Sequence, residues 1–98
     1  MKFSVKKNEN VALLIRKLKY VPKGAEGEEF NCVKYLGDSE YPRFHLFIKQ
    51  DRDNNLFFNL HLDQKKPSYE GSPAHSGEYE GKLIEEEKER IIKVLEEE

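Results

Sequence analysis

The stretch YPRFHLFIKQDRDNNLFFNLHLD (residues 41–63) alternates apolar and polar side chains on both sides of a DRDNN segment (51–55). Successive side chains of a β-strand point to opposite faces, so this pattern predicts an antiparallel hairpin. Asp and Asn are typical of hairpin turns, and we expect Asn54 or Asn55 to adopt the left-handed conformation. The apolar face, which we expect to meet the helices, consists of Phe44, Leu46, Ile48, Leu56, Phe58, Leu60 and Leu62.

The opposite face of the hairpin collects charged, titratable and aromatic side chains. Its members are Arg43, His45, Phe47, Lys49, Phe57, Asn59, His61 and Asp63. If Gln50 opposes Leu56, then His45 lies across from His61, Arg43 from Asp63 and Phe47 from Asn59. A slip of two residues keeps both faces intact but sets His45 against Asn59. Both registers stay open at this point.

Three further elements are predicted around the hairpin. Residues 9–20 have the apolar spacing of an amphipathic helix, with Asn8 as its N-cap, and residues 80–97 have the same spacing with an acidic N-terminal part. Residues 29–36 alternate as a strand, with Asn31, Val33 and Tyr35 on one side. Residues 23–29 are expected to be a flexible connection, and residues 64–79 a long loop.

These elements predict the fold class. The 98 residues are expected to form a single small domain. The order αβββα predicts a two-layer α+β domain in which both helices pack on one face of a three-stranded antiparallel sheet. The other face of the sheet is then left open.

Composition narrows the classes of function. Cys32 is the single cysteine, so no disulfide and no cysteine-based zinc cluster is expected within one chain. We find neither a signal peptide nor an apolar run long enough to span a membrane, and we therefore expect a cytoplasmic protein without membrane contact. The net charge is −2, with a mildly basic front half and an acidic C-terminal third. This asymmetry suits either a nucleic-acid face or a solvated acidic helix.

A divalent metal is the candidate cofactor. His61 and Asp63 point to the same side of one strand, His45 lies near them in one register, and His75 comes from the loop. Imidazole and carboxylate ligands on a shared face suit zinc, manganese or nickel. The alternative is that His61 and Asp63 are ordinary hydrogen-bonding groups on a half-exposed sheet.

The 64–79 loop carries residues that suit general acid–base chemistry. His75 is the candidate general base, with Tyr69 or Ser76 nearby, and His61 is a second candidate catalytic residue. Alternatively, Ser76 caps the last helix and His75 stabilises the loop.

The open face also has the character of an interaction surface. Phe47 and Phe57 lie beside Arg43, Lys49 and Asn59. Aromatic side chains next to cations stack the bases of single-stranded RNA, but an uncovered apolar patch equally suits a homodimer or a protein partner. Cys32 is expected to be a core residue.

Two resemblances accompany these observations. The strings YPRFHLFI, NLHLDQKKPSYEG and AHSGEYEG resemble a small bacterial protein family of unknown function, over roughly residues 41–90. The αβββα order is similar to that of double-stranded-RNA-binding-like folds, including HicA-type toxins, which use a strand histidine to cleave mRNA. No Gly-Ser-His motif precedes His45, and the long loop and acidic last helix depart from that pattern, so the likeness implies an element order only.

The sequence therefore yields two hypotheses of function. In the first, the protein is a cytoplasmic binding or interaction domain. Its ligand or partner surface is the open sheet face, from Arg43, His45 and Phe47 across to Phe57 and Asn59, together with Tyr69 and Ser76 of the loop. In the second, it is a small enzyme, either a metal-dependent hydrolase or an RNA nuclease. That enzyme uses His61, Asp63 and His75, with His45 in support.

Overall fold

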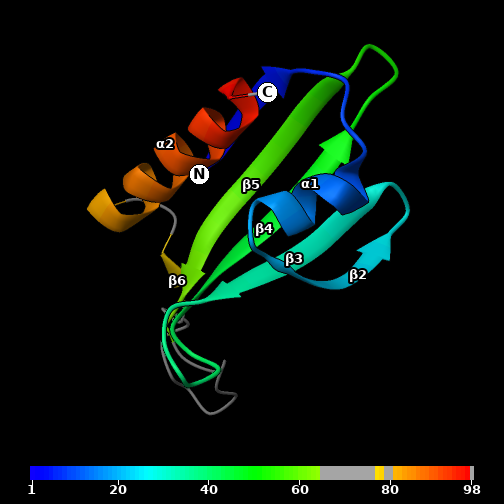
Figure 1. The fold of residues 1–98 in the computed structure, drawn as a ribbon. Helices are drawn as coiled ribbons and strands as arrows, with labels where there is room; N and C mark the ends of the chain where they lie inside the picture. The colour runs from blue at the N-terminus through cyan, green and yellow to red at the C-terminus, as the bar shows by residue number, and fades with distance from the viewer. Residues whose placement is uncertain (65–76, 79–80, 98) are drawn as a thin grey trace.

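The computed structural model describes residues 1–64, 77–78 and 81–97. Its elements follow the order β-α-β-β-β-β-β-α (Figure 1). They are β1 (Lys2–Lys6), α1 (Val11–Lys17), β2 (Val21–Glu26), β3 (Glu29–Tyr35), β4 (Arg43–Gln50), β5 (Asn55–Asp63), β6 (Gly77–Glu78) and α2 (Lys82–Glu96).

The strands form one antiparallel sheet in the order β1-β5-β4-β3-β2. The two-residue β6 pairs with the end of β5, opposite Leu62 and Asp63. Strands β2 to β5 are joined as successive neighbours, whereas β1 pairs with β5 and α1 carries the chain across to β2 at the opposite edge (Figure 1). The longest strand, β5, is therefore an interior strand, paired with β1 on one side and β4 on the other.

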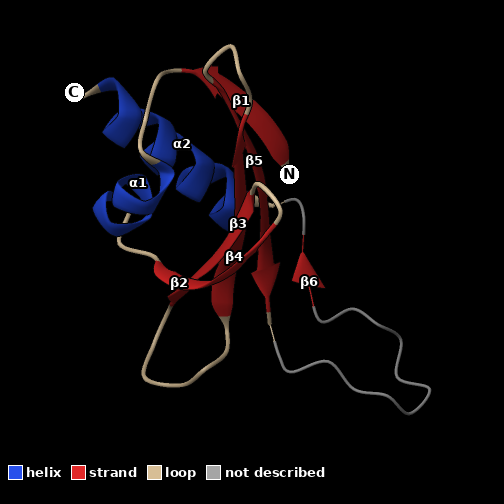
Figure 2. Ribbon diagram, turned by 90° about the vertical axis from the view of Figure 1, so that its right-hand side faces the viewer, coloured by secondary structure: helices blue, strands red, loops and turns tan. Residues whose placement is uncertain are grey.

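Both helices cover the same face of the sheet (Figure 2). The predicted apolar face of the hairpin is buried beneath them, as expected for a two-layer α+β fold. The core consists of Val11, Leu14, Ile15, Leu18, Tyr20, Cys32, Phe44, Leu46, Ile48, Leu56, Phe58, Leu60, Leu62, Ile84, Ile91 and Leu95. The α+β class and the placement of the helices are confirmed.

The prediction of a three-stranded sheet is wrong, because the main sheet has five strands and the short β6 besides. The missed strands β1 and β2 form the two edges. Residues 23–26 of β2 were expected to be part of a flexible connection. All of β2 is exposed, and it contains Pro22 and Gly24, with a register shift between them. Its strand character comes from backbone pairing with β3 rather than from an apolar face, so no side-chain pattern marks it. The predicted element order αβββα is therefore wrong as well.

The helix boundaries also shift. Helix α1 begins two residues later than expected, because Asn10 rather than Asn8 is the N-cap and accepts a hydrogen bond from the Leu13 amide. It ends at Lys17, before the proline expected to stop it, and Lys19 then turns the chain with a φ of 70°. Helix α2 starts at Lys82 instead of residue 80. Neither helix combines the length and apolar character needed to cross a bilayer, among the residues that the structure describes.

The hairpin turn agrees with the sequence. Asn54 takes the left-handed conformation, with a φ of 63°. The Asp51 carboxylate accepts hydrogen bonds from the amides of Asp53 and Asn55, each at 2.9 Å. These bonds fix the turn and pair Gln50 with Leu56. Of the two registers left open by the sequence, the first is the one that forms.

Candidate metal centre

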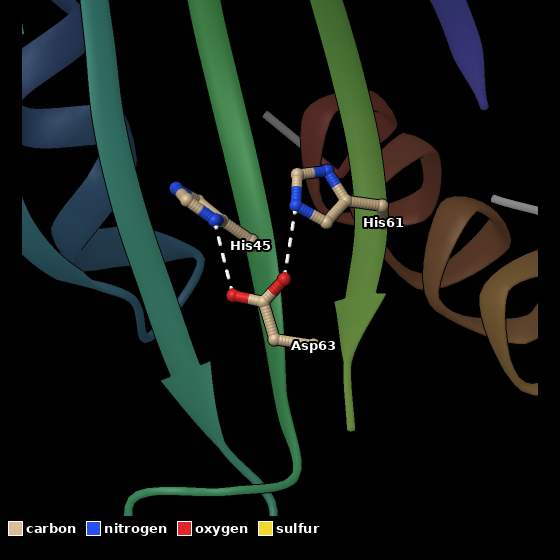
Figure 3. Close-up of side chains that lie close together, drawn as sticks. All are labelled: His45, His61 and Asp63. Atoms are coloured by element: carbon tan, nitrogen blue, oxygen red, sulfur yellow. Dashed lines mark hydrogen bonds and ion pairs between the residues drawn. The ribbon is translucent and has the colours of Figure 1, made fainter. Parts of the chain in front are cut away.

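Strands β4 and β5 bring His45, His61 and Asp63 together on the face that the helices leave open (Figure 3). The register pairs His45 with His61 and Arg43 with Asp63. Directly paired residues of antiparallel strands project to the same side, and residues two apart on one strand do so as well. We call His45, His61 and Asp63 the His–Asp cluster.

The distances within the His–Asp cluster suit a metal ion. His45 Nδ1 lies 3.2 Å from Asp63 Oδ2, and His61 Nε2 lies 3.1 Å from Asp63 Oδ1 (Figure 3). One ligand atom from each residue can be chosen so that all lie within 4.8 Å of one another. Ligands about 2 Å from a tetrahedral zinc ion are roughly 3.3 Å apart. The cluster therefore needs only a small adjustment to hold such an ion.

His45 faces an oxygen atom through each of its ring nitrogens. Nδ1 faces Asp63 Oδ2, and Nε2 is in close contact with the side-chain Oδ1 of Asn31 on β3. A neutral imidazole has a single N–H, so a neutral His45 turns a lone pair toward one of these oxygens. A cation at Nδ1 removes this conflict, because Nε2–H then donates to Asn31 while Nδ1 and Asp63 both bind the ion.

The surroundings favour neutral imidazoles. The side chains of His45 and His61 are only 17% and 12% exposed. Burial lowers the pKa of His45; Asp63 opposes this shift, and the Arg43 guanidinium adds to it. Burial also lowers the pKa of His61, against the effect of Asp63 and together with that of His45. Both rings are thus neutral at neutral pH, which is the form that binds a metal.

The face continues from the cluster toward the hairpin turn. Phe47 stacks on His45 with ring centroids 4.6 Å apart. Beyond it lies a hollow of about 440 Å³ lined by Lys2, Phe3, Ser4, Glu29, Phe47, Phe57, Phe58 and Asn59. We call this the β1–β3 hollow. Phe57 at its wall is 46% exposed.

The structure brings together only some of the predicted site residues. Arg43, His45, Phe47, Phe57, Asn59, His61 and Asp63 all belong to β4 and β5 and face one way. His75, Tyr69 and Ser76, which were predicted to act with them, lie outside the described residues.

Asn31 is the residue that the sequence did not assign to the site. The strand that contains Asn31 was predicted, with Asn31, Val33 and Tyr35 on one side. The sequence did not give the register between β3 and β4, and it is this register that pairs Asn31 with Phe47 and so places it near His45. Cys32, by contrast, is buried as predicted, and its thiol approaches the Leu46 carbonyl at 3.4 Å. Burial raises the pKa of the Cys32 thiol to about 12, which makes it a poor nucleophile at neutral pH.

Comparisons with protein-family models, curated proteins and solved structures found no match for this chain. The geometry of the His–Asp cluster is therefore the main indication of what the protein does.

Proposed function

We propose that this protein is a metal-binding domain that holds one divalent transition-metal ion through His45 Nδ1, His61 Nε2 and Asp63. The observation that carries the proposal is the convergence of these ligand atoms within 4.8 Å. Two imidazoles and a carboxylate suit zinc first, and also manganese, iron, cobalt or nickel. His75, the third ligand predicted from the sequence, lies outside the described residues, so this set is built with His45.

Counting donors from the described residues alone, the His–Asp cluster leaves at least one coordination position for a further ligand. Zinc sites with three protein ligands are typical of catalytic rather than purely structural centres, because the fourth position accepts water or substrate. A metal-bound water has a lowered pKa and is a nucleophile near neutral pH. Of the two enzyme hypotheses, this chemistry favours a metal-dependent hydrolase over an RNA nuclease. We include the hydrolase activity in the proposal.

Metal titration tests the site directly. Protein purified without a metal-affinity tag and stripped with a chelator should bind close to one equivalent of Zn²⁺ or Mn²⁺ in isothermal titration calorimetry. His61→Ala should abolish this binding, and Asp63→Asn should weaken it while keeping the shape of the side chain. Lys49→Ala, on the same face but away from the cluster, is the matched control.

Circular dichroism spectra of the variants show whether each one is folded. Folded wild-type protein that binds no metal, or a His61→Ala variant that binds it as tightly as wild type does, would contradict the proposal. A His75→Ala variant asks separately whether the ligand predicted from the sequence contributes.

The β1–β3 hollow supports a second function, binding of a partner at the open face. Its aromatic wall, with Phe57 about half exposed, is an apolar patch of the kind that protein interfaces use. We propose that a second copy of the chain is its occupant, with single-stranded RNA as the alternative. The hollow lies toward the hairpin turn and the His–Asp cluster toward the opposite end of β4 and β5, so the two functions are compatible.

A further inference from the structure

Arg43 extends the His–Asp cluster along the open face. It is the register partner of Asp63, and its Nε donates to Asp63 Oδ2 at 3.2 Å. The same oxygen faces His45 Nδ1. A carboxylate has about four lone-pair positions, so Asp63 can accept from Arg43 and bind a metal ion at the same time. The guanidinium therefore lies directly beside the proposed ion.

The guanidinium is held in a fixed orientation. Its central carbon lies over the Tyr41 ring, 4.5 Å from the centroid, and the Arg43 side chain is only 15% exposed. Nη1 lies 3.9 Å from Glu40, which is beyond hydrogen-bonding distance. Among the described residues, only Nε has a hydrogen-bond partner. Within that part of the chain, the terminal N–H groups are thus oriented but lack an acceptor.

Charge balance indicates what that acceptor is. The charges of Arg43 and Asp63 cancel, and the two imidazoles bind a metal as neutral ligands. A divalent ion gives the site a net charge of about +2 among side chains that are 12–17% exposed, where an uncompensated charge is costly. Glu40 is 69% exposed and is screened by solvent. A doubly negative ligand restores neutrality.

We propose, building on the metal site above, that the exogenous ligand of the metal is a phosphate group bound between the ion and Arg43. One phosphate oxygen occupies the open metal position, and another accepts from the Arg43 terminal N–H groups. Arginine suits this role because its planar fork matches the spacing of phosphate oxygens. A singly charged, planar carboxylate balances the charge less well.

Phosphorus NMR tests the proposal with inorganic phosphate as the probe. Bound Mn²⁺ strongly increases the relaxation rate of a phosphate in its coordination sphere, so Mn²⁺-loaded protein reports binding directly. Arg43→Gln should weaken phosphate binding by roughly tenfold to a hundredfold, the loss expected for a hydrogen bond to a charged group. The phosphate affinity of Arg43→Lys should lie between those of wild type and Arg43→Gln, because lysine keeps the charge but not the planar fork of the guanidinium. Lys49→Gln, on the same face of β4, should match wild type.

Metal binding is measured on the same samples. Arg43→Gln should hold Mn²⁺ at least as tightly as wild type, since a neighbouring cation is removed. If Arg43→Gln binds both metal and phosphate like wild type, the phosphate proposal is wrong and the metal site stands. If wild-type protein binds no metal, both the metal-site proposal and the phosphate proposal are wrong. Phenyl phosphate and acetate as further probes separate phosphomonoester, free phosphate and carboxylate binding, and preference for acetate would also overturn the proposal.

Discussion

His45 shows how one side chain acquires chemistry from its neighbours. One ring nitrogen faces Asp63 and the other faces Asn31, so the position of its proton depends on which neighbour accepts it. With Nε2–H directed to Asn31, Nδ1 is left as a metal ligand. Residues that orient a ligating histidine in this way typically change metal affinity by a factor of about 10 to 100.

Replacing Asn31 tests this positioning role. We expect Asn31→Leu to lower Zn²⁺ affinity about 10-fold to 100-fold in a calorimetric titration. Asn31→Asp keeps an oxygen acceptor for His45 Nε2 and adds a negative charge, so its Zn²⁺ affinity should equal or exceed that of wild type. Asn59→Leu makes the same chemical change on the same face without touching His45, and it should leave the affinity unchanged. An equal loss in both leucine variants would point to a general effect on the sheet instead.

At the scale of elements, the short helix α1 depends on α2. A seven-residue helix is not stable on its own. Just after α1, the Tyr20 hydroxyl donates to the buried Glu87 carboxylate at 2.6 Å. Arg90 donates to Glu87 and, at 2.7 Å, to the Leu18 carbonyl at the C-cap of α1. Burial, with the negative charge of Glu87, raises the pKa of Tyr20 well above its usual value, so Tyr20 stays a donor.

Removing the Tyr20 hydroxyl should loosen this link. We expect Tyr20→Phe to lower the free energy of unfolding by about 1.5–3 kcal/mol, because a buried hydrogen bond to a charged group is lost. Urea denaturation with an unchanged m-value measures the difference. Tyr35→Phe, on the open face, should change it by less than about 0.5 kcal/mol. Comparable losses in the two variants would show that the Tyr20–Glu87 bond adds nothing specific.

At the scale of the whole molecule, the arrangement of two layers separates stability from binding. Both helices lie on one face of the sheet (Figure 2), where the apolar core is buried. The His–Asp cluster and the β1–β3 hollow share the other face. Substitutions on the open face can therefore change binding without opening the core.

The open face gives a prediction about assembly. We expect the protein to form a concentration-dependent dimer in sedimentation velocity experiments. Phe57→Asp should make it a monomer, because a carboxylate would lose its hydration when the interface buries it. Leu13→Asp, at an exposed apolar position on α1, is the control and should dimerise normally. A wild-type protein that stays monomeric removes the second function in its dimer form. Binding of single-stranded RNA that weakens as salt rises would then favour the alternative occupant.

The sequence predicted the elements whose side chains carry a periodic pattern. An apolar stripe or face is buried in the 41–63 hairpin, the strand near Cys32 and the two amphipathic helices. Apolar residues therefore recur at every second position in the strands and at every third or fourth position in the helices. Strand β2 left no such mark, because all its residues are exposed and it is held by backbone hydrogen bonds that any side chain permits. Strand β1 does alternate, with Phe3 and Val5 packed against the core, but this pattern of two apolar residues was too short to predict a strand.

For the site, the sequence by itself determined that His61 and Asp63 share a face, because the β-pleat fixes that for residues two apart. Tertiary structure decided the rest. The turn at Asp51 and Asn54 selected the register that sets His45 beside His61, and strand β3 brought Asn31 to the outer nitrogen of His45. A two-residue shift would preserve both faces of the hairpin while separating the two histidines, so composition and alternation could not choose between the alternatives.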